Sequence, residues 1–423
     1  MFEIWKSVAA VSGARMYSLI ASAAMVTIVA RWLGPAGQGT IGAANAWATL
    51  LATMGSLSLG QVAVHHATVR RHETWLPETM GTLGMFAMVV TVAAWVVGTL
   101  LYVGTDGRAF GAMPASALAV ASLMVPFLVW ELYGANLLTV TNRLNIYNSA
   151  QLIGRTVGVV LMAVCWFLRF GVIAALAVGV ISQMIIACVG IRELFAIAGG
   201  GVRATVKEAK ALLRSAARLH INTVTGYVYT SLGVLIVNRY CTPTETGWYQ
   251  LCVSLVNVLL VVPLAAASVL TTEVVRVGPD AAWRLQRRVL VSVPLLMTGL
   301  AVAAAVCAPV AIPLVVGQKY IPAVPLFQWS LFGIVGLSLA AIMASQWIGR
   351  GYFWQLSASS IVVAVIHLTA TLWLVRRFGM FGAVYANLIT SGIAILGNGA
   401  FAVFCELRYR HAVGGVASLA VVR

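Results

Sequence analysis

Charged residues are scarce in this sequence, and their scarcity excludes an ordinary soluble fold. Only 9% of the 423 residues are charged, 61% are hydrophobic, and the mean hydropathy is +0.95. Soluble domains carry about 25% charged residues, which cover much of their surface. A chain of this length with so few charges must be solvated mostly by lipid. Because its apolar runs are long and lack period-two alternation, we expect spanning helices and no β-barrel.

Acidic residues, cysteine pairs and metal-binding patterns are also few or missing, which limits the chemistry. The chain has only 11 Asp plus Glu, and its six cysteines form no Cys-x-x-Cys pair. We interpret these cysteines as small core residues. The sequence offers no convincing Ser-His-Asp arrangement, metal-ligand cluster or phosphate-binding glycine loop. We therefore predict no metal and no cofactor, and we do not expect an enzyme.

Long apolar segments predict the fold class. We expect an all-α integral membrane protein with twelve transmembrane helices, because each segment is near the roughly 20 residues that cross a bilayer. The twelve predicted spans are Val8–Ala30, Ile41–Val64, Met80–Tyr102, Ala115–Leu138, Ser149–Leu168, Val172–Leu194, Leu219–Val237, Trp248–Leu270, Val289–Val310, Ala323–Trp347, Gln355–Val375 and Ala383–Glu406.

A sequence echo predicts that the chain consists of two related halves. Arg31, Pro35 and Gly39 recur 208 residues later as Arg239, Pro243 and Gly247. Arg169-Phe170-Gly171 recurs at the same spacing as Arg377-Phe378-Gly379. With six spans each, both halves enter the membrane in the same direction, related by an axis along its normal. We predict two pseudo-symmetric six-helix lobes, residues 1–198 and 219–423, joined by an amphipathic cytoplasmic linker, residues 199–218.

The basic residues are distributed unequally between the two sides of the membrane. Eighteen of the 27 Lys plus Arg fall on the side that holds the N-terminus and the even-numbered connections, and seven fall on the other side. This bias places both termini in the cytoplasm. The formal charge of +16 is therefore explained by topology and by contact with anionic lipid. We expect no nucleic-acid partner. Trp283 and its neighbouring arginines are a second candidate for an interfacial helix.

Three ionisable residues stand inside predicted spans, where charges are costly and usually functional. Arg15, Glu131 and Arg155 each lie about seven residues from the cytoplasmic end of their helix, or roughly 10 Å deep. They suggest a cavity, open to the cytoplasm, that attracts an anion such as phosphate. Two other interpretations remain open: Arg15 extends to the headgroups, and Glu131 and Arg155 only pair two helices.

Polar residues on other predicted spans extend this candidate binding site. His220, Thr223 and Tyr227 share one face of the seventh span, and Thr223 matches Arg15 under the 208-residue shift. Gln61 in the second span and Asn257 in the eighth are further candidates. We expect these side chains to contact the substrate.

Three connecting turns resemble those of bacterial polysaccharide and O-antigen flippases of the multidrug/oligosaccharidyl-lipid/polysaccharide (MOP) exporter superfamily. They are Ala30–Gly39, Val237–Gly247 and Gly317–Ala323. The resemblance implies a flippase that moves a polyisoprenoid-pyrophosphate-linked oligosaccharide to the outer leaflet by alternating access, for cell-surface polysaccharide biosynthesis. It also implies a bacterial inner-membrane location, a pyrophosphate held by Arg15 and less directly by Arg155, H⁺ or Na⁺ as a coupling ion, and association with a polysaccharide polymerase and glycosyltransferases.

Two alternative functions are kept. A cation-coupled multidrug exporter would fit the same fold, but it would favour a carboxylate in the first or seventh span, and neither span has one. A polyisoprenoid-dependent polymerase, ligase or glycosyltransferase would need a larger extramembrane loop with acidic or histidine residues.

Overall fold

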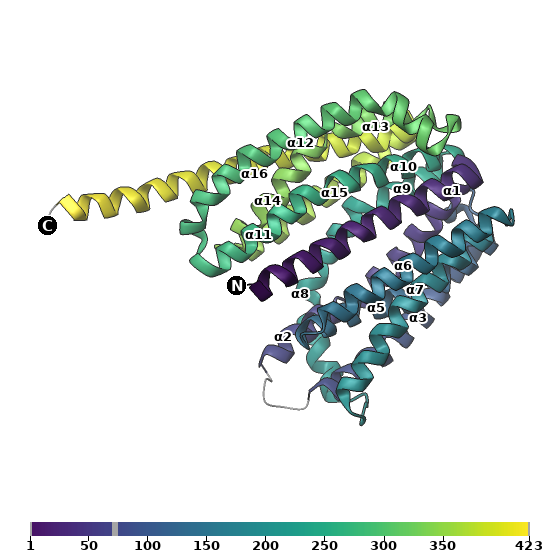
Figure 1. Cartoon of the computed structure of the whole chain (residues 1–423), viewed down its shortest axis with the longest axis horizontal. Helices are drawn as coiled ribbons and strands as arrows, with labels where there is room; N and C mark the ends of the chain where they lie inside the picture. Colours follow the sequence, from purple (N-terminus) through teal and green to yellow (C-terminus); the bar gives the residue numbers. More distant parts are fainter. Residues whose placement is uncertain (1, 70–74, 422–423) are drawn as a thin grey trace. The chain divides into compact units, whose positions relative to one another are not determined.

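The structure is a computed structural model that describes residues 2–69 and 75–421, and these residues form helices without a β-strand. Their contacts divide the chain into two compact units, residues 1–250 and residues 251–423. Figure 1 shows the helices of each unit packed side by side. The contact division differs from the predicted lobe boundary, which stays a prediction.

The first unit contains ten complete elements and the start of α10. They are α1 (Phe2–Ser56), α2 (Leu59–Val69), α3 (Leu76–Gly104), the 3₁₀ turn η1 (Arg108–Phe110), α4 (Ala115–Ser122), α5 (Val125–Val140), α6 (Leu144–Phe167), α7 (Val172–Ala198), α8 (Val206–Thr230), α9 (Leu232–Tyr240) and α10 (Pro243–Leu259). Its core is mostly aliphatic and includes the fully buried Leu83, Val129 and Leu137 of α3 and α5.

The second unit contains the end of α10 and the remaining elements. They are α11 (Val261–Val277), α12 (Pro279–Val316), the 3₁₀ turn η2 (Gln318–Tyr320), α13 (Ala323–Leu331), α14 (Ile334–Gly349), α15 (Phe353–Phe378) and α16 (Met380–Val421). Trp283, in the second candidate interfacial helix, is packed inside this unit and does not face lipid. Its ring is 1% exposed, packs with Met343 and Phe401, and donates to the Glu406 carboxylate at 2.8 Å.

The number of spanning helices differs from the prediction. In the described part of the chain, nine helices are long and apolar enough to cross a membrane, or ten if the bent pair α13–α14 is one span. The chain is therefore a multi-pass helical membrane protein, and the count of twelve is not confirmed. Two of the differences come from α1, which contains the first predicted span and most of the second, and from α8 and α9, which divide the seventh at Ser231.

A turn inside α1 joins the first predicted span to the beginning of the second. Gly34 has φ 67° and ψ −174°, a conformation outside the helical region, and Pro35 follows it. Only glycine adopts a positive φ at little cost, so this position is suited to the change of direction. In Figure 1 the chain turns back here and returns toward α2.

The predicted linker joins the seventh span without a break. Helix α8 begins at Val206 and continues to Thr230, and the Thr205 side chain caps its start by accepting from the Glu208 amide. Glu208 is 1% exposed and accepts a 2.9 Å hydrogen bond from Thr79 of α3. Arg203 pairs with Glu78 at the same helix end. These contacts fix the linker against α3. The linker and the polar start of the seventh predicted span form one continuous amphipathic helix.

The two echoed turns meet in the first unit. A Cβ atom added to Gly39 would overlap the Pro243 carbonyl oxygen, and one added to Gly247 would overlap the Pro35 carbonyl oxygen. The contact is reciprocal, because each glycine lies against the proline of the other motif. Glycine is required here because the two backbones approach each other closely.

Candidate functional site

The Glu131 carboxylate of α5 is held by three hydrogen-bond donors from the two helices that follow. Tyr147 of α6 donates to Oε1 at 3.1 Å, Gln151 of α6 donates to the same oxygen, and Gln183 of α7 donates to Oε2. All four residues are half-buried within helices that are candidate membrane spans. Several neutral donors offset the cost of placing a carboxylate in this environment.

Arg155 continues the same network one helical turn after Gln151. Its Nε donates to Gln151 Oε1 at 3.3 Å, and its Nη1 donates to Ser22 Oγ of α1 at 3.3 Å. A guanidinium has five N–H groups. Within the described residues three of them have no acceptor and Arg155 has no ion-pair partner. Its charge is therefore oriented by neutral groups and remains available to an anion.

Close packing of α6 on α7 brings this network together. A Cβ atom added to Gly154 would overlap the Ile186 side chain, and Ser182 Oγ donates to the Gly154 carbonyl at 2.8 Å. Gly158 lies against the same serine. Gln183 follows Ser182 directly, so the glycine contact brings it within reach of Glu131. We call Ser22, Glu131, Tyr147, Gln151, Arg155 and Gln183 the polar network.

Arg15 belongs to α1, but its side chain lies outside the described residues. It precedes Ser22 by seven residues, which is close to two helical turns, so its backbone lies on the same face of α1 about 10 Å along the axis. The predicted substrate role of Arg15 stays a prediction. Glu131 and Arg155 do not form a direct ion pair among the described residues, because Gln151 lies between them.

His220 and Thr223 form a second polar group with Ser58. Ser58 is buried at the break between α1 and α2, where Leu57 and Ser58 have φ values of 47° and 55°. Its hydroxyl lies 2.7 Å from Thr223 Oγ1 and 3.3 Å from His220 Nδ1. The structure thus brings together two of the predicted site residues from the seventh span.

The other predicted residues are dispersed. Tyr227 is 5% exposed and its hydroxyl donates to the Ala46 carbonyl of α1, so it joins two helices and does not face open space. Gln61 in α2 is exposed. Asn257 in α10 is also exposed and belongs to the second unit.

The structure also contains polar groups that the sequence-based list omitted. Gln151 and Gln183 are amides inside apolar spans, and the i, i+4 spacing of Gln151 and Arg155 is a detectable signal. Arg350 lies in the turn after α14, and its side chain is only 3% exposed and contacts Asp280 at 2.8 Å. It also donates to Gln346 at 3.0 Å and closes the end of α14 onto the start of α12.

The described residues offer neither the ligand set of a metal site nor a disulfide. In residues 2–69 and 75–421 no group of three His, Cys, Asp or Glu side chains could hold a metal ion. The six cysteines are free thiols.

Comparisons with known proteins agree with the fold. A family model described as "Polysaccharide biosynthesis protein" matches residues 4–271. Among solved structures, an inward-facing multidrug resistance MATE family transporter of the MOP superfamily has a TM-score of 0.69 at 12% identity, covering 92% of this chain and 95% of that one. The lipid II flippase MurJ in an inward closed conformation has a TM-score of 0.72 at 11% identity, covering 92% and 86%.

An outward-facing MATE transporter of the same superfamily has a TM-score of 0.58 at 13% identity, covering 95% of this chain and 96% of that one. Among curated proteins none matches the chain.

Proposed function

Because this chain belongs to the polysaccharide biosynthesis protein family and has the fold of MOP-superfamily transporters, we propose that it moves a polyisoprenoid-pyrophosphate-linked oligosaccharide across the membrane. The fold is that of a transporter or flippase and not that of an enzyme. The head group passes from the cytoplasmic to the outer leaflet by alternating access, in a bacterial inner membrane with both chain termini in the cytoplasm. The bias in Lys and Arg supports this orientation.

One observation carries the proposal: the Arg155 guanidinium lies inside a span with three N–H groups unused among the described residues. Arginine binds phosphate through pairs of parallel N–H···O bonds and stays charged when partly desolvated. Ser22 and Gln151 fix the direction of the guanidinium without neutralising it. A pyrophosphate would therefore meet an oriented, uncompensated positive charge. Arg15, on the same helix face as Ser22, would add a second.

Glu131 serves to position the network. Its carboxylate holds Gln151, which in turn holds Arg155, and it fixes Tyr147 and Gln183 at the same time. If transport is coupled to H⁺ or Na⁺, Glu131 is the site we assign, because it is the carboxylate of the polar network. Ser58, His220 and Thr223 offer hydroxyl and imidazole groups to the sugar, which we propose they contact together with the exposed Gln61.

The test is export in a deletion strain complemented with variants of the chain. We expect Arg155→Gln to lower surface glycan by about tenfold or more, the effect of losing charge-assisted bonds of 1.5 kcal/mol or above, while lipid-linked oligosaccharide accumulates inside. Arg155→Lys should retain part of the export, because it keeps the charge but not the fork.

Arg192→Gln is the matched control, because Arg192 is exposed at the inner end of α7 and outside the polar network. Full export by Arg155→Gln would overturn the anion site. Drug sensitivity without any glycan defect in the deletion strain would favour the multidrug exporter instead.

A further inference from the structure

One face of α12 is exposed along most of its length, with basic residues at its start and prolines at its end. At 100° per residue, eight positions fall within an arc of about 60°. They are Arg284, Arg288, Val291, Leu295, Val302, Val306, Pro309 and Pro313. The four aliphatic side chains are each more than half exposed. We call this face the α12 stripe.

The two arginines at the start of the stripe are not neutralised within the described residues. The carboxylates near them are already used: Asp280 contacts the buried Arg350, Glu406 contacts Arg287 and Arg410, and Glu273 contacts Arg276. Arg284 and Arg288 are exposed and one turn apart. Two free guanidiniums on adjacent turns match the charge and spacing of a phosphate or diphosphate group.

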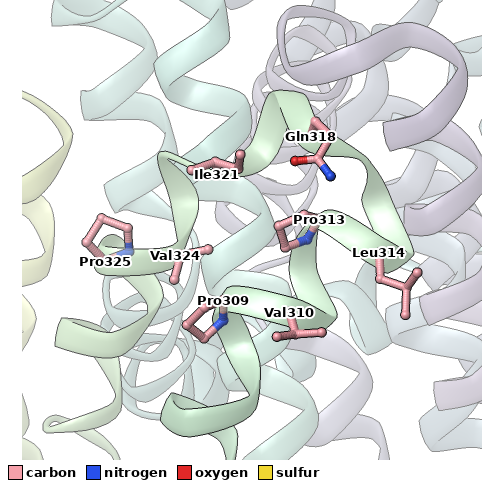
Figure 2. A pocket seen from close by; sticks show the side chains of 8 residues that line it. All are labelled: Pro309, Val310, Pro313, Leu314, Gln318, Ile321, Val324 and Pro325. Atoms are coloured by element: carbon pink, nitrogen blue, oxygen red, sulfur yellow. The ribbon is translucent and has the colours of Figure 1, made fainter.

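The other end of the stripe opens into an apolar pocket of about 520 Å³. Figure 2 shows the side chains that line it, from the end of α12, from η2 and from the start of α13. The lining residues are Pro309, Val310, Pro313, Leu314, Gln318, Ile321, Val324 and Pro325, of which only Gln318 is polar. A pocket of this composition receives a hydrocarbon chain and rejects a polar head group.

The distance between the two arginines and the pocket determines how long a lipid must be to occupy both. Arg288 and Pro309 are 21 residues apart in one helix, or about 32 Å at 1.5 Å per residue. The hydrocarbon chain of an ordinary phospholipid covers one leaflet, which is half of a core about 30 Å thick. A chain anchored by its phosphate at Arg288 would therefore end near the bilayer centre. Only a much longer chain reaches the proline pocket.

We propose that the α12 stripe is a docking site for a long-chain polyisoprenyl diphosphate, with the diphosphate at Arg284 and Arg288 and the far end of the chain in the proline pocket. The site holds the lipid carrier and is separate from the polar network around Arg155. The identity of the lipid rests on the proposed function. The two anchor points rest on the geometry of α12 alone.

Photolabelling of the purified full-length protein in nanodiscs tests this site. The probe is a sugar-free long-chain polyisoprenyl diphosphate with a photoreactive group at the end of its chain, and farnesyl diphosphate with the same group is the short comparison. We expect the long probe to label residues 306–325 and the short probe to leave them unlabelled. The double variant Arg284→Gln/Arg288→Gln should lower this labelling about tenfold, as expected for lost charge-assisted contacts.

Arg276→Gln is the matched control, since Arg276 is exposed but paired with Glu273 at 2.8 Å, and its labelling should equal that of the natural chain. Equal labelling by the short probe, labelling unaffected by the double variant, or equally strong competition by phosphatidylglycerol would each overturn the proposal. Because the probe carries no sugar and nothing is translocated, a failure of glycan transport would leave this result unchanged, and the two failures can be told apart.

Discussion

Arg155 is placed by neutral groups, and this arrangement determines what it can do. A charged side chain at the centre of a membrane helix costs about 2.5–3.5 kcal/mol on insertion scales. An ion pair with Glu131 would lower that cost but would also cancel the charge. Gln151 lies between the two and bonds to both. The arginine is thereby stabilised while its charge remains available to a phosphate.

The bridging amide can be tested by a substitution that keeps its size. We expect Gln151→Leu to lower the free energy of unfolding in detergent by about 1–3 kcal/mol, because it removes one hydrogen bond from Glu131 and one from Arg155. Gln61→Leu is the matched control, since Gln61 is exposed and its side chain makes no hydrogen bond among the described residues. Its unfolding free energy should change by no more than about 0.5 kcal/mol. An equal loss in both variants would contradict the bridging role.

At the residue scale, the charged residues inside spans can be identified from the sequence, but their hydrogen-bond partners cannot. Glu131 and Arg155 are visible because a charge within an apolar run is rare. Gln183 is not among the predicted site residues, because the sequence around a single amide in a span does not show which way its side chain points. Its place near Glu131 depends on the contact of Gly154 with α7, which only the packing shows. Arg350 does lie in a connection, the turn after α14, but its burial depends on tertiary contacts that the sequence does not show.

Helix ends and turns were predicted well where glycine or proline marks them. The break at Gly34-Pro35 lies within the turn expected from the sequence, and Gly379 ends α15 with a φ of 59°. The continuation of the linker into α8 was not foreseen. Its first turns are basic and its later turns are uncharged, but both have helical periodicity, so no sequence signal separates them.

The contact between the echoed turns predicts that Gly39 and Gly247 do not tolerate alanine, whereas a helix glycine outside the contact does. Gly247→Ala should destabilise the protein by about 1–3 kcal/mol, the cost of overpacking, because the new methyl group would overlap the Pro35 carbonyl. Gly39→Ala should behave alike through Pro243. Gly226→Ala in α8 is the control: nothing lies within 4 Å of its Cβ position, and alanine should stabilise the helix by about 1 kcal/mol. Thermal unfolding in detergent measures all three, and a neutral Gly247→Ala would argue against the close contact.

For the whole molecule, composition alone predicts the class. Low charge and long apolar runs lead to a helical membrane protein, and the fold of MOP transporters agrees with this. The number of spans is less accessible, because a hydropathy window cannot tell a bent helix pair from one span, as with α13 and α14, which meet at 43°. The division into lobes depends on contacts between distant segments and stays a prediction.

The proposed orientation can be tested by labelling single cysteines from outside the cell. In a variant without the six natural cysteines, Arg108→Cys should react with a membrane-impermeant maleimide in intact cells, and Lys207→Cys should react only after the membrane is opened. Both residues are exposed, so accessibility does not distinguish them. The reverse pattern would show that the basic side faces outward and would contradict the assigned topology.

The most direct measurement of the central claim is movement of the substrate in proteoliposomes that contain only this protein. A radiolabelled polyisoprenyl-diphosphate oligosaccharide is incorporated in both leaflets, and the fraction oxidised by impermeant periodate is followed with time. With the natural chain we predict that the protected pool becomes accessible, and that with Arg155→Gln it stays protected as in protein-free vesicles. A protected pool that remains unchanged with the natural chain under both a proton and a sodium gradient would contradict the account.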